Sequence, residues 1–183
     1  MKKTWKDVLD FWFAPEHVGL HFVEDKDFDE LIKEEFLETW KRGSEGLLMD
    51  WRDSLEGRLA EIIVLDQFSR NLFRDDIRTY TQDRMAIALA QEAVKQPGYE
   101  ALSPDKKRYI LLPFMHSESL ELHDWARPLF ETMGDDNTLH FEKLHYEVLE
   151  RFGRYPYQNK DLGRESSPEE EAYLEEKAGS HYS

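Results

Sequence analysis

Apolar residues recur at helical spacing through most of the chain and predict a series of amphipathic helices. Segment 5–13 places bulky side chains on one side and follows Thr4, a residue type that caps helices. From 28 to 41, apolar positions three or four residues apart lie between acidic ones, which is typical of a helix with one solvated face. A break at 43–46 and a turn follow, and Ser54 is predicted to cap the next helix.

Segment 55–73 differs from its neighbours because it is apolar on nearly every side. Such a helix is usually buried at the centre of a domain. This one nevertheless carries Asp66, Arg70 and Arg74 along one broad face. Because an unpaired buried charge costs several kcal/mol, we expect these charges to be paired or to line a cavity.

Helix start and stop signals continue in the middle of the chain. Thr81 is predicted to cap a helix over 82–96, and Ser103 with the proline after it predicts the start of another. That helix meets Pro113, and proline disfavours helical geometry in the residue before it. We therefore expect the triplet His116-Ser117-Glu118 to lie at a helix junction, where its serine would cap the following helix.

The last third of the chain follows the same logic. The segment after the junction is expected to be interrupted by Pro128, and a helix is predicted at 137–152. A loop over 154–159 separates it from a short final helix at 168–177, and the tail 178–183 is expected to be frayed.

No stretch shows the sustained alternation of apolar and polar residues that strands require. The sequence therefore predicts an all-α fold of antiparallel helix pairs with short connections, in a single domain over residues 1–183. A hydrophobic content of 40% with 13% aromatic residues is typical of a globular chain with a real core.

The charge balance narrows the classes of partner. There are 24 basic and 39 acidic residues, so the net charge is −15, which argues against nucleic acid and anionic membranes. The absence of cysteine excludes disulfides and thiolate metal sites and fits a reducing compartment. With no signal-peptide core and no apolar run of about 20 residues, we expect a cytoplasmic protein. No phosphate loop or metal motif is present, so no cofactor or metal is predicted.

Four polar clusters supply the candidate site residues. These are Asp66, Gln67, Arg70, Asn71, Arg74, His116, Glu118, His145, Arg151, Arg154, Asn159 and Arg164. The cluster on segment 55–73 is interpreted either as a wall of an anion-binding pocket or as a network that holds helices together. The stretch 151–164 is basic within an acidic chain, so it either attracts anions or pairs with surplus carboxylates.

The two histidines also have two interpretations each. His116 and Glu118 would act as base, acid or metal ligands, although three consecutive residues do not specify a metal site. The plainer alternative is that the triplet only caps a helix. His145 lies beside Leu149 on one helix side, and a lone histidine in such a place is usually a satisfied core residue.

Four sequence blocks together resemble a known family. They are LDQFSRNLFRDD at 65–76, LPFMHSE at 112–118, H-x5-RFGRYPYQN at 145–159 and LGRESSPEE at 162–170. In this order they resemble the bacterial family catalogued as domain of unknown function 924, over essentially the whole chain. The resemblance implies an all-helical, tetratricopeptide-like fold and no established reaction. The family typically has His-Arg where this chain has Tyr157-Gln158, and Pro where it has Ser69.

Three functions are compatible with these patterns. The first is binding of a small anionic molecule or a peptide in the arginine-rich polar centre. The second is a hydrolase-like enzyme that uses Asp66, His116, Glu118 and His145 around one cavity. The third is a protein-interaction scaffold of the tetratricopeptide type. No pattern in the sequence indicates the oligomeric state.

Overall fold

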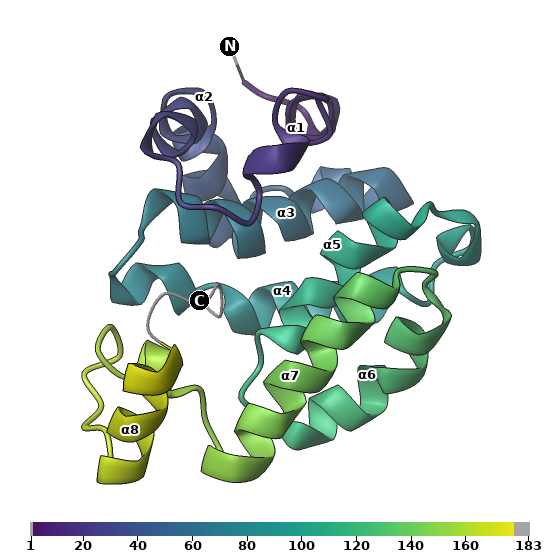
Figure 1. Ribbon diagram of the computed structural model, residues 1–183. Helices are drawn as coiled ribbons and strands as arrows, with labels where there is room; N and C mark the ends of the chain where they lie inside the picture. The colour runs from purple at the N-terminus through teal and green to yellow at the C-terminus, as the bar shows by residue number, and fades with distance from the viewer. Residues whose placement is uncertain (1, 178–183) are drawn as a thin grey trace.

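The computed structural model describes residues 2–177, and over that range it contains eight α-helices and no β-strand (Figure 1). The helices are α1 (Trp5–Trp12), α2 (Lys26–Ser44), α3 (Leu55–Leu72), α4 (Asp83–Ala93), α5 (Pro104–Met115), α6 (Leu120–Thr132), α7 (Asp136–Phe152) and α8 (Pro168–Lys177). The connections contain short 3₁₀ helices: η1 (Val18–Leu20), η2 (Met49–Asp53), η3 (Ile77–Tyr80), η4 (Tyr99–Ala101) and η5 (Pro156–Gln158). The all-α prediction is confirmed.

A repeat of the tetratricopeptide kind, with a concave face for partner proteins, stays a prediction. The single domain over 1–183 also stays a prediction. The tail that we expect to be frayed, 178–183, lies outside the described residues. Within residues 2–177, no helix is both long enough and apolar enough to cross a membrane.

Helix α3 occupies the centre of the helical assembly. It packs against α1 and α2 on one side and against α4 and α5 on the other (Figure 1). Every residue from 59 to 69 is buried, which confirms the expectation of a central helix that is apolar nearly all round. The second buried acid of this helix, Glu61, receives two hydrogen bonds of 2.7 Å from Arg52. The guanidinium neutralises this carboxylate and so offsets the free-energy cost of burying it.

Helix ends follow the predicted caps in some places and not in others. The Thr4 and Ser54 hydroxyls accept backbone N–H groups, as predicted. Thr81 was the wrong cap: its hydroxyl donates to the Arg78 carbonyl within η3, and α4 begins only at residue 83. Ser117 is not a cap either, because Ser119 accepts the N–H of Leu122 and starts α6.

The two internal prolines do not break their helices, which corrects the sequence-based expectation. Pro113 lies inside α5, where Leu112 and Phe114 are packed in the core. Burial of these flanking side chains outweighs the roughly 3 kcal/mol that an internal proline costs. Pro128 lies on the exposed side of α6, so its ring meets solvent instead of another helix.

Helix α2 is longer at both ends than its apolar spacing indicated. Asp25 caps it by accepting the N–H of Phe28. Gly43, expected in a break, belongs to the helix, and a Cβ atom there would lie 3.2 Å from Leu48 and Leu65 side-chain atoms. This glycine therefore permits close packing of α2 on α3, and the chain turns only at Gly46, whose φ is +73°.

Candidate functional site

A carboxylate at the middle of α3 organises the polar centre. The Asp66 side chain is completely buried and accepts three hydrogen bonds. They come from Gln67 Nε2 at 2.6 Å, His116 Nδ1 at 2.8 Å and Arg70 Nη1 at 3.1 Å. These donors come from α3 and from the end of α5, two segments that lie 50 residues apart in sequence and meet at the Asp66 carboxylate.

The electrostatics keep Asp66 ionised. Burial alone would raise the pKa of its carboxyl group, but the charges of Arg70 and His116, with the hydrogen bonds from His116 and Gln67, lower that pKa to about 2. An ionised carboxylate can only accept hydrogen bonds, so Nδ1 of His116 must carry a proton. The other ring nitrogen, Nε2, has no hydrogen-bond partner among the described residues. The histidine is thus oriented through one nitrogen and available through the other.

Local structure explains where His116 lies. It is the residue at which α5 ends, and α6 starts four positions later, so the predicted helix junction is present. Its side chain is 17% exposed, and those of Arg70 and Asp83 are 21% and 17% exposed. The centre therefore has a narrow edge that reaches solvent, while Asp66 behind it has none.

Asp83 is a site residue that the sequence analysis missed. Arg70 contacts Asp66 on its own helix and also Asp83, at 3.1 Å from Nη1 and 3.3 Å from Nη2. Asp83 stands in the first turn of α4, where an acid is ordinarily explained by the helix dipole. Only the path of the chain through η3 reveals that it faces Arg70.

His145 lies near the same centre without touching it. Its Nδ1–H donates to the carbonyl of Phe141 at 2.8 Å, one turn earlier in α7. Burial is the main cause that lowers the pKa of its imidazole to about 4, and the nearby charge of Arg70 acts in the same direction. His145 is therefore neutral at physiological pH, and its backbone bond agrees with the interpretation as a satisfied core histidine.

Glu118 belongs to a second network, beside the first. Its carboxylate receives two hydrogen bonds from Arg164, at 2.7 and 2.8 Å, and one from the N–H of Tyr155. Arg164 also donates to Asn159 Oδ1 at 2.8 Å. Three predicted residues thus fasten the segment after α7 to the α5–α6 junction.

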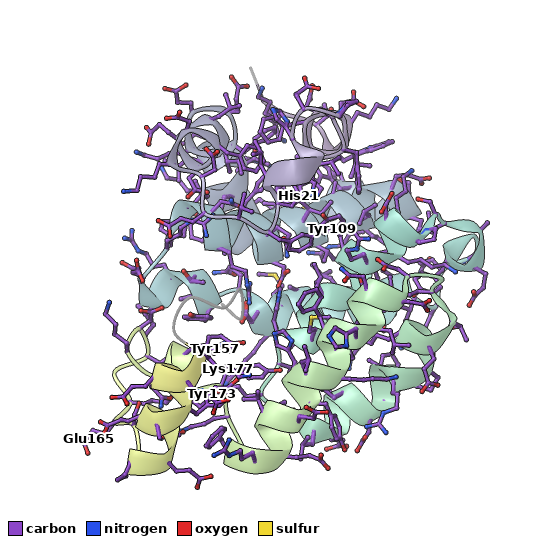
Figure 2. All side chains as sticks on the ribbon, in the orientation of Figure 1. His21, Tyr109, Tyr157, Glu165, Tyr173 and Lys177 are labelled. Carbon is purple, nitrogen blue, oxygen red and sulfur yellow. The ribbon has the colours of Figure 1, made fainter. Side chains whose placement is uncertain are left out.

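The same segment approaches the first network through Asp161 and through its own tyrosines, Tyr155 and Tyr157. Tyr80 donates to Asp161 at 3.1 Å. Tyr157 stacks on Tyr155 with ring centroids 5.3 Å apart. Burial raises the pKa of Tyr157, whereas the nearby charge of Arg70 lowers it. In Figure 2, Tyr157 lies on the side of the C-terminal segment that faces α4.

A buried pair behind these tyrosines was also missed. His123 on α6 bonds to Glu142 on α7 through Nδ1 at 2.5 Å and to the Ser117 carbonyl through Nε2 at 2.9 Å. Burial raises the pKa of Glu142, although His123 opposes that shift. The Tyr155 hydroxyl donates to the Met115 carbonyl and lies 3.1 Å from His123 Nε2. This cluster connects α5, α6 and α7 to one another.

The other predicted residues lie elsewhere and are paired. Asn71, in the last turn of α3, and Arg74, beyond the end of that helix, both donate to Asp29 on α2. Arg154 donates to Glu170 and Arg151 to Glu169, both on α8. The five predicted arginines therefore do not meet in one place, and each contacts at least one carboxylate.

Comparison with known proteins gives a consistent result. No curated protein matches the chain. A solved structure of a protein of unknown function, ATU0120 from Agrobacterium tumefaciens, is 35% identical and superposes with a TM-score of 0.86. The match covers 94% of this chain and 97% of that one. A family model described as "Bacterial protein of unknown function (DUF924)" matches residues 8–178, and the chain therefore belongs to the DUF924 family.

Proposed function

We propose that the protein is an acid–base enzyme of the hydrolase type, with His116 as general base and Asp66 as the group that orients it. The observation that carries the proposal is the 2.8 Å bond from His116 Nδ1 to an ionised, fully buried carboxylate, together with the unpartnered Nε2. A carboxylate in this position fixes the tautomer of the imidazole and stabilises its protonated form. An imidazole that is oriented through one nitrogen and open at the other has the geometry that a general base requires.

The chemical step follows from that arrangement. Nε2 of His116 removes a proton from a water molecule while the water oxygen forms a bond to an electrophilic carbon or phosphorus atom of the substrate. The proton then passes from Nε2 to the leaving group as its bond to that atom breaks. Asp66 stays ionised throughout and stabilises the imidazolium that exists between the two transfers.

The charges around the base favour a particular class of substrate. Arg70, the arginine that contacts Asp66, is shared between that residue and Asp83, so the local positive charge is already neutralised. A strongly anionic substrate would have to displace one of these carboxylates. We therefore propose a neutral or weakly charged ester or amide. Binding of an anion or peptide by the remaining arginines stays a prediction, weakened by the ion pairs that they make.

Kinetics of matched variants test this function. Hydrolysis of a panel of nitrophenyl esters and anilides is measured for the unmodified protein, for His116→Gln and for His140→Gln, which changes an exposed histidine on α7. Loss of the general base should lower kcat/KM by about 10²- to 10⁴-fold, whereas the control should leave it unchanged. Equal rates in all three proteins would show that His116 only helps to hold the fold together.

A further inference from the structure

A second feature of the molecule is a hollow of about 390 Å³ on the side of α3 that faces α2. Its apolar lining comes from Leu37, Trp40, Leu72 and Phe73. Its remaining lining residues are the cations Lys33, Lys41 and Arg78. The volume lies within the range of small-molecule sites. The site around Asp66 shares none of these residues.

Helix α2 contributes one wall of the hollow, and the helical period explains which of its residues form that wall. Lys33, Leu37 and Lys41 are four residues apart, so their side chains lie one above another on one face of the helix. Leu37 therefore lies between two ammonium groups. Arg78 comes from η3, beyond the end of α3, and brings a third positive charge to the same hollow.

The aromatic part of the lining is held in place before any ligand arrives. The rings of Trp40 and Phe73 lie 4.6 Å apart at an angle of 59°. Trp40 donates its indole N–H to Ser69 Oγ at 2.8 Å, which fixes the orientation of the ring. The Arg78 guanidinium covers Phe73 at 4.5 Å from the ring centroid. Preorganised aromatic surface of this kind lowers the entropy cost of binding a flat molecule.

The cations can accept a new anionic partner. Three cations surround one apolar hollow in a chain with a net charge of −15, and each of them pairs with one acid. Arg78 pairs with Asp76 at 2.9 Å, and their side chains are 58% and 35% exposed. Lys33 and Lys41 pair with Glu30 and Glu38 on their own helix, and all four side chains are more than half exposed. Exposed pairs of this kind contribute little, so a ligand carboxylate can replace them at small cost.

We propose that this hollow is a binding site for small aromatic carboxylates. The aromatic ring of the ligand packs against Trp40 and Phe73. Its carboxylate lies between the ammonium groups of α2 and the guanidinium of Arg78. The proposal is independent of chemistry at His116, because the two sites have no residue in common.

Calorimetric titration with 2-naphthoate at low salt tests the proposal, with 2-naphthamide as the neutral analogue of the same shape. We expect the carboxylate to bind more tightly than the amide by about tenfold and to lose affinity as salt is added. In an NMR titration, the indole N–H signal of Trp40 should shift, since Trp40 lines the hollow and a bound aromatic ring changes its magnetic surroundings.

Charge variants locate the site without disturbing the core. Lys41→Gln and Arg78→Gln change exposed side chains, and each should weaken 2-naphthoate binding by about threefold. Lys95→Gln is the matched control, because Lys95 makes the same exposed pair, with Glu92, away from the hollow. The proposal is overturned if 2-naphthoate does not bind, if the amide binds equally well, or if the control weakens binding as much as Lys41→Gln.

Discussion

Replacing Asp66 by asparagine is the most informative single change for this fold. The substitution keeps the size of a fully buried side chain but removes its charge. It also places an NH₂ group at one carboxylate oxygen, which is either Oδ1, the acceptor for His116 and Arg70, or Oδ2, the acceptor for Gln67. Because Arg70 keeps its contact with Asp83, the variant should fold, with a measurable loss of stability.

The magnitude follows from the pKa of the carboxyl group. Its value falls from 3.8 to about 2 in the folded protein, and this difference corresponds to about 2 kcal/mol of stabilisation at neutral pH. The hydrogen-bond donor that faces the new NH₂ group loses its acceptor, and this lowers the stability by about 1 kcal/mol more. A total of about 3 kcal/mol should lower the Tm by roughly 6–12 °C in a chain of this size.

Urea unfolding followed by circular dichroism measures this loss, with the exposed Asp124→Asn as control. Because the folded-state pKa of Asp66 is depressed, its stabilisation is complete above about pH 4 and disappears as the pH falls towards 2. The difference in the free energy of unfolding between the unmodified protein and Asp66→Asn should therefore shrink over that pH interval. A difference below about 1 kcal/mol at pH 7, or one that does not change with pH, would refute the reasoning.

Two further predictions concern the packing of the helical core. Gly57→Ala would place a Cβ atom 1.9 Å from the carbonyl oxygen of Trp51, so we expect a loss of at least about 2 kcal/mol in thermal unfolding, whereas Gly19→Ala meets no atom within 4 Å and should be neutral. Burial lowers the pKa of His21 to about 4 despite its hydrogen bond to the Trp12 carbonyl, so the unfolded chain takes up the proton first and stability falls by up to about 3 kcal/mol as the pH drops from 6.5 to 4. His21→Gln should flatten this pH dependence in urea titrations, and an unchanged slope would contradict the assignment.

His21 also shows how much of the core was beyond sequence reasoning. Its ring stacks on Trp12 at 3.8 Å and accepts the hydroxyl of Tyr109, 88 residues away, at 2.5 Å. Figure 2 shows His21 and Tyr109 close together where the connection after α1 meets α5. No local pattern marks this pair, because residue 21 stands in an irregular connection whose path depends on the finished fold.

Features of the chain that depend on neighbouring residues were predictable. Helical spacing and cap residues located the helices of the described residues, apart from the interruption expected at Pro128 within α6, and the cost of burying a charge correctly required a partner for Asp66. What depends on tertiary packing was not predictable. The core around Pro113 keeps that proline inside a helix, and Thr81 lost its role as a cap because η3 uses its hydroxyl.

Partner choice in the polar network was the hardest part. With 39 acidic side chains available, the sequence cannot tell that Arg74 bonds to Asp29 on α2 while Arg164 bonds to Glu118. Each pairing joins elements that are at least 45 residues apart, so it depends on the crossing of helices and not on local spacing.

The fastening of the C-terminal segment has a consequence for the order of folding. The hydrogen bonds that hold the segment join residues far apart in sequence: 81 residues for Tyr80 and Asp161, 46 for Glu118 and Arg164, and 40 for Met115 and Tyr155. Their earlier partners lie on η3, at the end of α5 and in the junction after it, and both η3 and α5 pack against α3. During synthesis, which proceeds from the N-terminus, we expect that scaffold to form first. The surroundings of His116 are then completed only when the last fifth of the chain has left the ribosome.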